Sequence, residues 1–183
     1  MKAAGVSGNV ITYNALISAA ARQGQVERAF EVWEEMQAAA LVPNVVTYTA
    51  LIAACQHGDR WVKAFEILLD MVQHDVQPDA MTFNALLSVC QTSGQWEQAL
   101  DCFEWMQQLG IAANVRLYSA AVNACGRAGR LEEAVAVFER SQRAGVRPNV
   151  VLYTSLIHAC QVAGNVDAAT HYLQEMVRVA ISP

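Results

Sequence analysis

The sequence repeats itself every 35 residues, without insertion or slip. The unit that begins at Val10 returns at Val45, Ala80, Val115 and Val150. Single columns keep this register, and one of them is alanine in every repeat: Ala29, Ala64, Ala99, Ala134 and Ala169. A fixed period of this length predicts a linear stack of similar units, in which each repeat contacts only its neighbours, and not a globular domain.

Five repeats account for nearly all of the 183 residues. Their boundaries are 10–44, 45–79, 80–114, 115–149 and 150–183, and residues 1–9 align with the end of a preceding repeat. We therefore interpret the chain as a segment of one continuous, longer array. Its last repeat lacks a following helix, so we expect an uncapped apolar side and self-association through it.

Each repeat contains two apolar stripes with helical spacing, which predicts a first (A) and a second (B) helix. In repeat 1, Gly24 separates the two stripes and Pro43 follows the second one. The predicted A helices are Thr12–Arg22, Thr47–His57, Thr82–Thr92, Leu117–Arg127 and Leu152–Val162. The predicted B helices are Val26–Ala38, Trp61–Gln73, Trp96–Leu109, Leu131–Arg143 and Val166–Val179.

Composition and motifs argue against several classes of function. The hydrophobic fraction is 54%, yet no run of 18 apolar residues occurs, so no membrane span is expected. The histidines and cysteines form no metal or deaminase motif and no phosphate loop is present. We thus expect no catalytic residue, metal, cofactor or small-molecule substrate. The net charge of -5 argues mildly against nucleic acid, although a stack can carry positive charge on one face.

Four cysteines occupy one column: Cys55, Cys90, Cys125 and Cys160. Packed helices lie roughly 8–10 Å apart, too far for thiolates in successive repeats to share a zinc ion with Zn–S bonds of ~2.3 Å. We interpret the column as small buried residues, because Ala20 takes the same place in repeat 1. Cys102 stands alone on a B helix and receives the same interpretation. Free buried thiols indicate a reducing compartment.

The unit resembles the pentatricopeptide repeat family. The resemblance rests on the (V/I)TYNALI opening, the glycine before the B helix, the E-x-A-F/L-x-x-(W/F)-x-x-M run and the Pro-Asn or Pro-Asp close. The tetratricopeptide repeat has a different length and opening. The resemblance implies an all-α, right-handed α-solenoid of helix-turn-helix repeats that binds single-stranded RNA. It also implies a chloroplast or mitochondrial location and a role in transcript stabilisation, processing, splicing or translation.

Two columns of small polar residues are the candidate base-selecting positions. The column after the aromatic residue is Asn14, Thr49, Asn84, Ser119 and Thr154, and the last residues of the repeats are Asn44, Asp79, Asn114 and Asn149. From the residues alone, helix capping is the favoured role of the second column. The resemblance implies instead that the two columns together select one base per repeat. The implied core is 5′-pyrimidine-G-pyrimidine-A-purine-3′.

The resemblance also implies residues that insert between neighbouring bases: Ile11, Val46, Met81, Arg116 and Val151. Arg116 departs from the apolar preference of this column, although a guanidinium can also stack on a base. Arg22, His57 and Arg127 lie toward the ends of A helices and are the expected phosphate contacts. Two alternatives stay open: a protein-interaction scaffold, and the RNA-specificity arm of an enzyme whose catalytic domain lies outside this segment.

Overall fold

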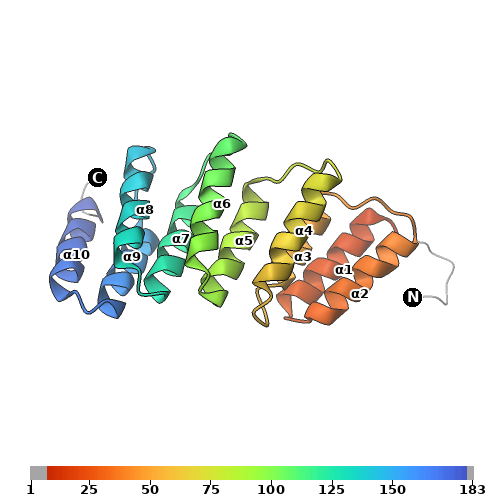
Figure 1. Ribbon diagram of the computed structural model, residues 1–183, viewed down its shortest axis with the longest axis horizontal. Helices are drawn as coiled ribbons and strands as arrows, with labels where there is room; N and C mark the ends of the chain where they lie inside the picture. Colours follow the sequence, from red (N-terminus) through yellow and green to blue (C-terminus); the bar gives the residue numbers. More distant parts are fainter. Residues whose placement is uncertain (1–7, 181–183) are drawn as a thin grey trace. The chain divides into compact units, whose positions relative to one another are not determined.

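The computed structural model describes residues 8–180, which fold into ten α-helices, two per repeat (Figure 1). These are α1 Val10–Arg22, α2 Val26–Ala38, α3 Val45–Ala54, α4 Trp61–Gln73, α5 Ala80–Ser93, α6 Trp96–Gln108, α7 Val115–Arg127, α8 Leu131–Arg143, α9 Val150–Val162 and α10 Val166–Ala180. Most of the predicted preceding-repeat segment, residues 1–7, and the close of repeat 5, residues 181–183, lie outside the described residues.

The chain divides into two compact units, residues 1–85 and 86–183, with the border inside α5. In the first unit, α1 packs against α2 and α3, and α3 packs against α4. In the second unit, α7 packs against α6, α8 and α9, and α9 packs against α8 and α10. Successive A helices thus lie next to one another in each unit, and the described residues contain no strand. The predicted all-α fold of stacked helix-turn-helix repeats is confirmed.

The A helices begin two residues earlier than predicted, because the last residue of the preceding repeat caps them. Asn44 is the N-cap of α3, and its Oδ1 accepts the backbone N–H of Thr47 at 3.2 Å. The Thr47 hydroxyl accepts the Asn44 N–H at 3.1 Å, which completes a capping box. Asn9, Asn114 and Asn149 cap their helices through the same amide oxygen. Capping of the A helices, the role favoured from the residues alone, is therefore confirmed for these asparagines.

The B helices begin at the predicted residues, but α3 ends three residues before the predicted His57. The turn after α3 contains two residues with positive φ, Gly58 at 87° and Asp59 at 55°. Asp59 takes the place that glycine holds in the other repeats, where Gly24 has φ of 68°. The additional left-handed residue begins the turn earlier and shortens the helix.

The repeats are held together by buried columns of small and aromatic side chains. In the alanine column, Ala29, Ala64, Ala99 and Ala134 are fully buried. Between repeats, the ring centroids of Phe103 and Tyr118 lie 5.0 Å apart, and those of Phe138 and Tyr153 lie 5.2 Å apart. In each pair a B-helix ring contacts the A-helix ring of the next repeat. In the second unit, B-helix aromatic rings therefore fill the layer between repeats.

Two A helices of the second unit, α7 and α9, approach each other closely at Gly126. A Cβ atom at this position would lie 2.7 Å from the Ala159 Cβ and 3.1 Å from the Ala159 Cα. Gly126 lies within α7 and has ordinary helical φ, so close packing against α9, and not backbone conformation, accounts for glycine here.

All five cysteines are buried and free. Burial raises the pKa of Cys55 and of Cys125 to about 11. Cys102 is buried, as predicted, and its thiol is hydrogen-bonded to Cys90. This bond and burial hold the Cys102 pKa well above its usual range. The thiols of Cys55, Cys102 and Cys125 are therefore protonated at neutral pH and act as small core residues.

The apolar side of α10 is less covered than that of the other B helices. Leu173 is 48% exposed, whereas the equivalent Leu68 is fully buried. Tyr172 and Met176 are half-buried, and Met71, which aligns with Met176, is fully buried.

Replacing Gly126 by Ala should separate α7 from α9 and lower the free energy of unfolding by ~1–3 kcal/mol. Helix propensity alone predicts the opposite sign, since alanine is favoured over glycine in a helix by about 1 kcal/mol. Urea denaturation of the parent and the variant distinguishes the two effects. A more stable variant would contradict the close approach.

Stability should fall as pH rises from about 9 to about 11. An unfolded thiol loses its proton near pH 8.5, whereas Cys55 and Cys125 keep theirs until about 11. The folded state thus binds more protons in this window, and its stability decreases as pH increases. Urea midpoints across this range should decline less steeply in a Cys55→Ala, Cys125→Ala double variant, whose alanines copy Ala20. Equal slopes would contradict the assignment.

The exposed side of α10 should support weak self-association at high protein concentration. Sedimentation velocity over a concentration series should show it, and Leu173→Gln should reduce it because the exposed apolar area is smaller. A parent that sediments as a monomer at every concentration would contradict the expectation.

Candidate functional site

Charge is separated between the two kinds of helix. None of the 17 acidic residues lies on an A helix, and all five A helices belong to the described part of the chain. The charged residues of the A helices are Arg22, Arg116 and Arg127, and all three are exposed. The A helices therefore carry a formal charge of +3, and the rest of the chain carries -8. The A-helix face of each unit is compatible with an anionic ligand.

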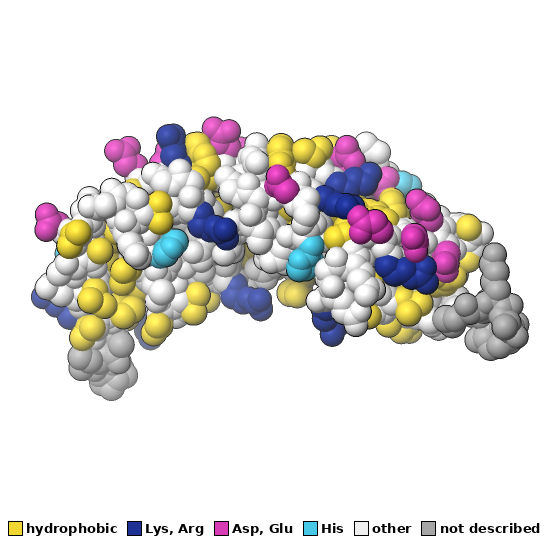
Figure 2. All heavy atoms as spheres, turned by 90° about the horizontal axis from the view of Figure 1, so that it is seen from below, with side chains coloured by type: hydrophobic (Ala, Val, Ile, Leu, Met, Phe, Trp, Pro, Cys, Tyr) yellow, Lys and Arg dark blue, Asp and Glu magenta, His cyan; other side chains and the backbone are white. Residues whose placement is uncertain are grey.

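Several acidic groups of the B helices are paired with neighbouring cations. Arg28 bonds Glu31 at 2.8 Å and Lys63 bonds Glu66 at 3.0 Å. Arg60 also pairs with Glu27. Dark blue and magenta side chains accordingly alternate over the first unit in Figure 2. Exposed pairs of this kind contribute only about 0–1 kcal/mol each, so these faces are solvated surfaces.

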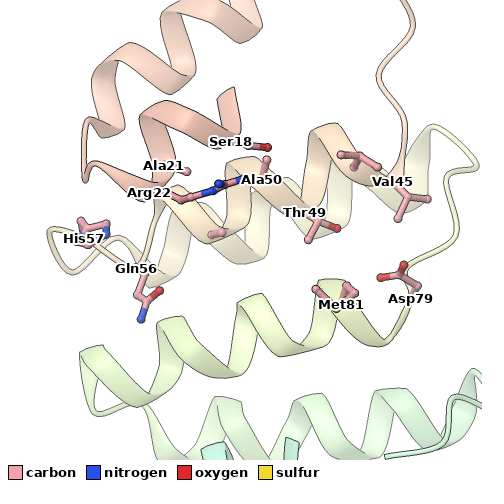
Figure 3. Close-up of a pocket in the computed structure, with 12 residues that line it drawn as sticks. Ser18, Ala21, Arg22, Val45, Thr49, Ala50, Gln56, His57, Asp79 and Met81 are labelled. Atoms are coloured by element: carbon pink, nitrogen blue, oxygen red, sulfur yellow. The ribbon is translucent and has the colours of Figure 1, made fainter. Parts of the chain in front are cut away.

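A groove of about 500 Å³ lies over α1, α3 and the start of α5 in the first unit (Figure 3). It gathers residues from all three predicted classes: Thr49, Asp79, Val46, Met81, Arg22 and His57. Figure 3 shows Thr49, Asp79 and Met81 toward one end and His57 with Gln56 toward the other. The base-selecting candidates of repeat 2 thus line a single groove with wedging and phosphate-binding candidates from repeats 1 to 3.

In repeats 1 and 2, the two base-selecting columns are joined by hydrogen bonds. Asn14 Nδ2 donates to Asn44 Oδ1 at 3.1 Å. The Thr49 hydroxyl lies 3.0 Å from the Thr82 hydroxyl, which donates to Asp79 Oδ1 at 3.0 Å. The predicted partners therefore lie together in both repeats. Asn44 and Asp79 are exposed, whereas Asn14 is buried.

In the second unit, the base-selecting hydroxyls bond within their own helices. Ser119 donates to the Val115 carbonyl at 2.8 Å, and Thr154 donates to the Val150 carbonyl at 2.7 Å. Asn149 caps α9 and is exposed. In repeat 3, Asn84 lies half-buried on α5 and Asn114 is the exposed N-cap of α7.

A second groove, of about 650 Å³, lies over α7 and α9 in the second unit. It is lined by three predicted residues, Arg127, Val151 and Thr154, and also by Asn123 and His158. Sequence reasoning missed Asn123 and His158, because they belong to a mixed column that holds Ser18, Ala53 and Ser88 elsewhere. The imidazole of His158 is exposed and adds a polar group beside Arg127.

The predicted wedge residues are exposed although most are apolar. The exposed fractions are 76% for Ile11, 55% for Val46, 59% for Met81 and 59% for Val151. Arg116 is exposed in the same column. Exposed apolar side chains at four of the five A-helix starts are unusual for a solvent face and are typical of a binding surface.

Sequence reasoning also missed two threonines, Thr47 and Thr82, which are fully buried beneath the base-selecting residues. The Thr47 hydroxyl donates to Asn14 Oδ1 at 2.6 Å. The signal was present as Asn-x-x-Thr and Asp-x-x-Thr, a capping pattern at the repeat junction. Within residues 8–180 no cluster of metal-ligating side chains occurs, and no helix has the length and apolar character needed to cross a bilayer.

Solved structures with the same fold are pentatricopeptide repeat proteins. Maize PPR10 is 28% identical, with a TM-score of 0.79, over 98% of this chain and 26% of PPR10. PPR10 in complex with an 18-nt psaJ RNA element is 24% identical, with a TM-score of 0.78, over 98% of this chain and 30% of that one. The chain therefore spans less than a third of PPR10.

The PPR domain of Arabidopsis thaliana protein-only RNase P 1, in complex with tRNA, has a TM-score of 0.76 at 20% identity. It matches over 93% of this chain and 92% of that domain. Among curated proteins, no sequence matches significantly.

Family comparisons cover the repeats from residue 8 onward. The PPR repeat family matches residues 8–57, 43–92 and 78–127. A PPR repeat matches residues 116–146, and a pentatricopeptide repeat domain matches residues 136–183. The chain therefore belongs to the pentatricopeptide repeat family.

Proposed function

We propose that this chain binds single-stranded RNA along its A helices and selects one base per repeat. The observation that carries this proposal is the groove of the first unit, where Thr49 and Asp79 lie with Val46, Met81 and Arg22. Polar groups for a base edge, apolar groups for a base face and a cation for phosphate are the three components of a single-strand site.

Repeat spacing favours bases that are separated by a protein side chain. Neighbouring helices lie roughly 8–10 Å apart, whereas stacked bases lie about 3.4 Å apart. A side chain of similar thickness between two bases approximately doubles that separation and brings it near the helix spacing. Val46 and Met81, exposed on successive A helices, are positioned to enclose one base between them.

The polar groups of the groove favour a base with a donor edge in repeat 2. Asp79 carries only acceptors when ionised, and Thr49 offers a hydroxyl. Guanine presents N–H donors on its Watson–Crick edge and therefore suits this pair. The proposed core remains 5′-pyrimidine-G-pyrimidine-A-purine-3′, with RNA running 5′ to 3′ from the first to the last repeat.

Phosphate contacts are few in this chain. Arg22, His57 and Arg127 are exposed beside the two grooves, and His158 adds a fourth candidate. If each base contributes ~1–3 kcal/mol by stacking, and ordering the RNA removes much of this, the affinity is on the order of micromolar or weaker.

We further propose recognition, and not catalysis, as the role of this segment. PPR10, which resembles it, has been crystallised with an RNA element, and the PPR domain of RNase P 1 with tRNA. The family context favours stabilisation, processing, splicing or translation of transcripts in a chloroplast or mitochondrion. An enzyme carrying this array would hold its catalytic residues in another domain.

Replacing Thr49 by Asn should change the preferred second base from guanine to uracil. An amide in place of the hydroxyl supplies a donor for a uracil carbonyl. Fluorescence anisotropy with RNAs of core U-N-U-A-A, where N is each base in turn, should give a shift of ~1–3 kcal/mol between guanine and uracil.

The matched control is the first RNA position, which is assigned to Asn14 and Asn44. The order of preference among the four bases at that position should be the same for parent and variant. Stability should change by less than about 1 kcal/mol, because Thr49 is partly exposed near a helix start. If parent and variant rank the four bases alike, Thr49 is not a base-selecting residue, and a protein-binding scaffold becomes the better account.

A further inference from the structure

We infer that Thr47 and Thr82 are positioning residues that fix the donor or acceptor state of the base-selecting pair above them. Each is the third residue of an A helix and bridges the two base-selecting residues of the repeat before it. We call them the relay threonines. The inference rests on the proposed RNA binding and deepens it. In repeat 1 the relay leaves hydrogen-bond donors for a base, and in repeat 2 it leaves acceptors.

In repeat 1 the orientation of every polar group follows from one backbone N–H. The Thr47 N–H must meet an acceptor, so the Asn44 atom 3.2 Å away is its oxygen. This oxygen also faces Asn14 at 3.1 Å, so the facing atom of Asn14 is its Nδ2. Asn14 Oδ1 then accepts the Thr47 hydroxyl at 2.6 Å. The groups left for a base are the second Nδ2 hydrogen of Asn14 and the amide nitrogen of Asn44, which are donors.

In repeat 2 the last residue is an aspartate, and the groups left for a base are acceptors instead of donors. Asp79 Oδ1 accepts the Thr82 N–H at 2.8 Å and the Thr82 hydroxyl at 3.0 Å. A carboxylate is a stronger acceptor than a hydroxyl, so the single hydroxyl hydrogen of Thr82 goes to Asp79. The Thr82 oxygen therefore accepts the Thr49 hydroxyl at 3.0 Å. The groups left for a base are Thr49 lone pairs and Asp79 Oδ2, which are acceptors.

Burial makes these orientations persistent. Thr47 and Thr82 are both fully buried, so their hydroxyls have no water as an alternative partner. A buried hydroxyl that loses its partner is strongly disfavoured. The relay thus holds Asn14 or Thr49 in one hydrogen-bonding state before RNA arrives, and preorganisation of this kind increases discrimination between ligands.

Repeat 4 has no relay threonine, because Leu152 takes the equivalent place. There Ser119 donates to the Val115 carbonyl of its own helix, while Asn149 Oδ1 accepts the Leu152 N–H at 3.0 Å. Leu152 is fully buried and has no side-chain polar group to join the two. Repeat 4 should therefore distinguish bases less sharply than repeats 1 and 2.

The test compares Thr82→Val, which removes the hydroxyl and keeps the shape, with Thr82→Ser, which keeps the hydroxyl. Binding of U-N-U-A-A RNAs should show a guanine preference for the parent and for Thr82→Ser. Thr82→Val should reduce that preference at least about fivefold, the loss expected for one hydrogen bond of ~1 kcal/mol. The preference at the first base should not change in either variant, since Thr47 is intact.

A purely structural role for Thr82 would lower the melting temperature or weaken binding to all RNAs equally, and would not change selectivity at one base. Thr47→Val supplies the reciprocal test, with loss confined to the first base, and it decides the question if Thr82→Val does not fold. A parent without base preference would refute the proposed function itself. A parent that prefers guanine, with folded Val variants that keep every preference, would overturn the relay alone.

Discussion

The rest of the structure depends on the hydrogen bond that the third backbone N–H of an A helix donates to the last side chain of the preceding repeat. It begins each of these A helices at a fixed residue, as Asn44 does for α3 and Asn149 does for α9. A cap of this kind is typically worth ~1 kcal/mol. The cap uses only Oδ1, which leaves the amide nitrogen of an asparagine, or Oδ2 of Asp79, for other partners. Capping and the proposed base selection are therefore not alternatives. The same residue performs the first role and remains available for the second.

Charge distribution resolves the apparent conflict between an acidic chain and an anionic ligand. Net charge is the sum over all faces of the protein, whereas a bound ligand contacts only one of them. The A helices, which lie entirely within the described residues, carry arginines and no acidic residue. Affinity in this chain should therefore depend more on stacking and hydrogen bonding than on phosphate neutralisation, and its salt dependence should be modest.

Much of the fold could be predicted from the sequence, because the columns that pack the repeats are constrained in size. The alanine column is fully buried at Ala29, Ala64, Ala99 and Ala134, and the rings of Phe103 and Tyr118 pack between repeats. Helix ends were less predictable, since Asp59 adopts a positive φ that its sequence does not require. The contact between Cys102 and Cys90 was not predicted, because the two residues lie on different helices.

The sequence predicted which columns of residues form the candidate site, but not the hydrogen bonds that connect them. Thr47 and Thr82 read as ordinary capping residues, and their second contacts, to Asn14 and Thr49, join residues 33 positions apart. Such contacts depend on the stacking distance between repeats, which sequence periodicity does not specify. Similarly, Ser119 and Thr49 share a column but have different hydrogen-bond partners. Thr49 contacts Thr82 of the next repeat, whereas the equivalent residue next to Ser119 is Leu152, which has no side-chain hydroxyl.

The central claim is that single-stranded RNA lies along the A helices, and photochemical cross-linking tests it most directly. RNAs of the proposed core carrying 4-thiouridine at one position would be irradiated with the protein, and the cross-linked peptides mapped by mass spectrometry. The account predicts cross-links at the starts of α1, α3, α5, α7 and α9 that advance by one repeat for each nucleotide. Cross-links that fall mainly on B helices, or do not move with the labelled position, would contradict it.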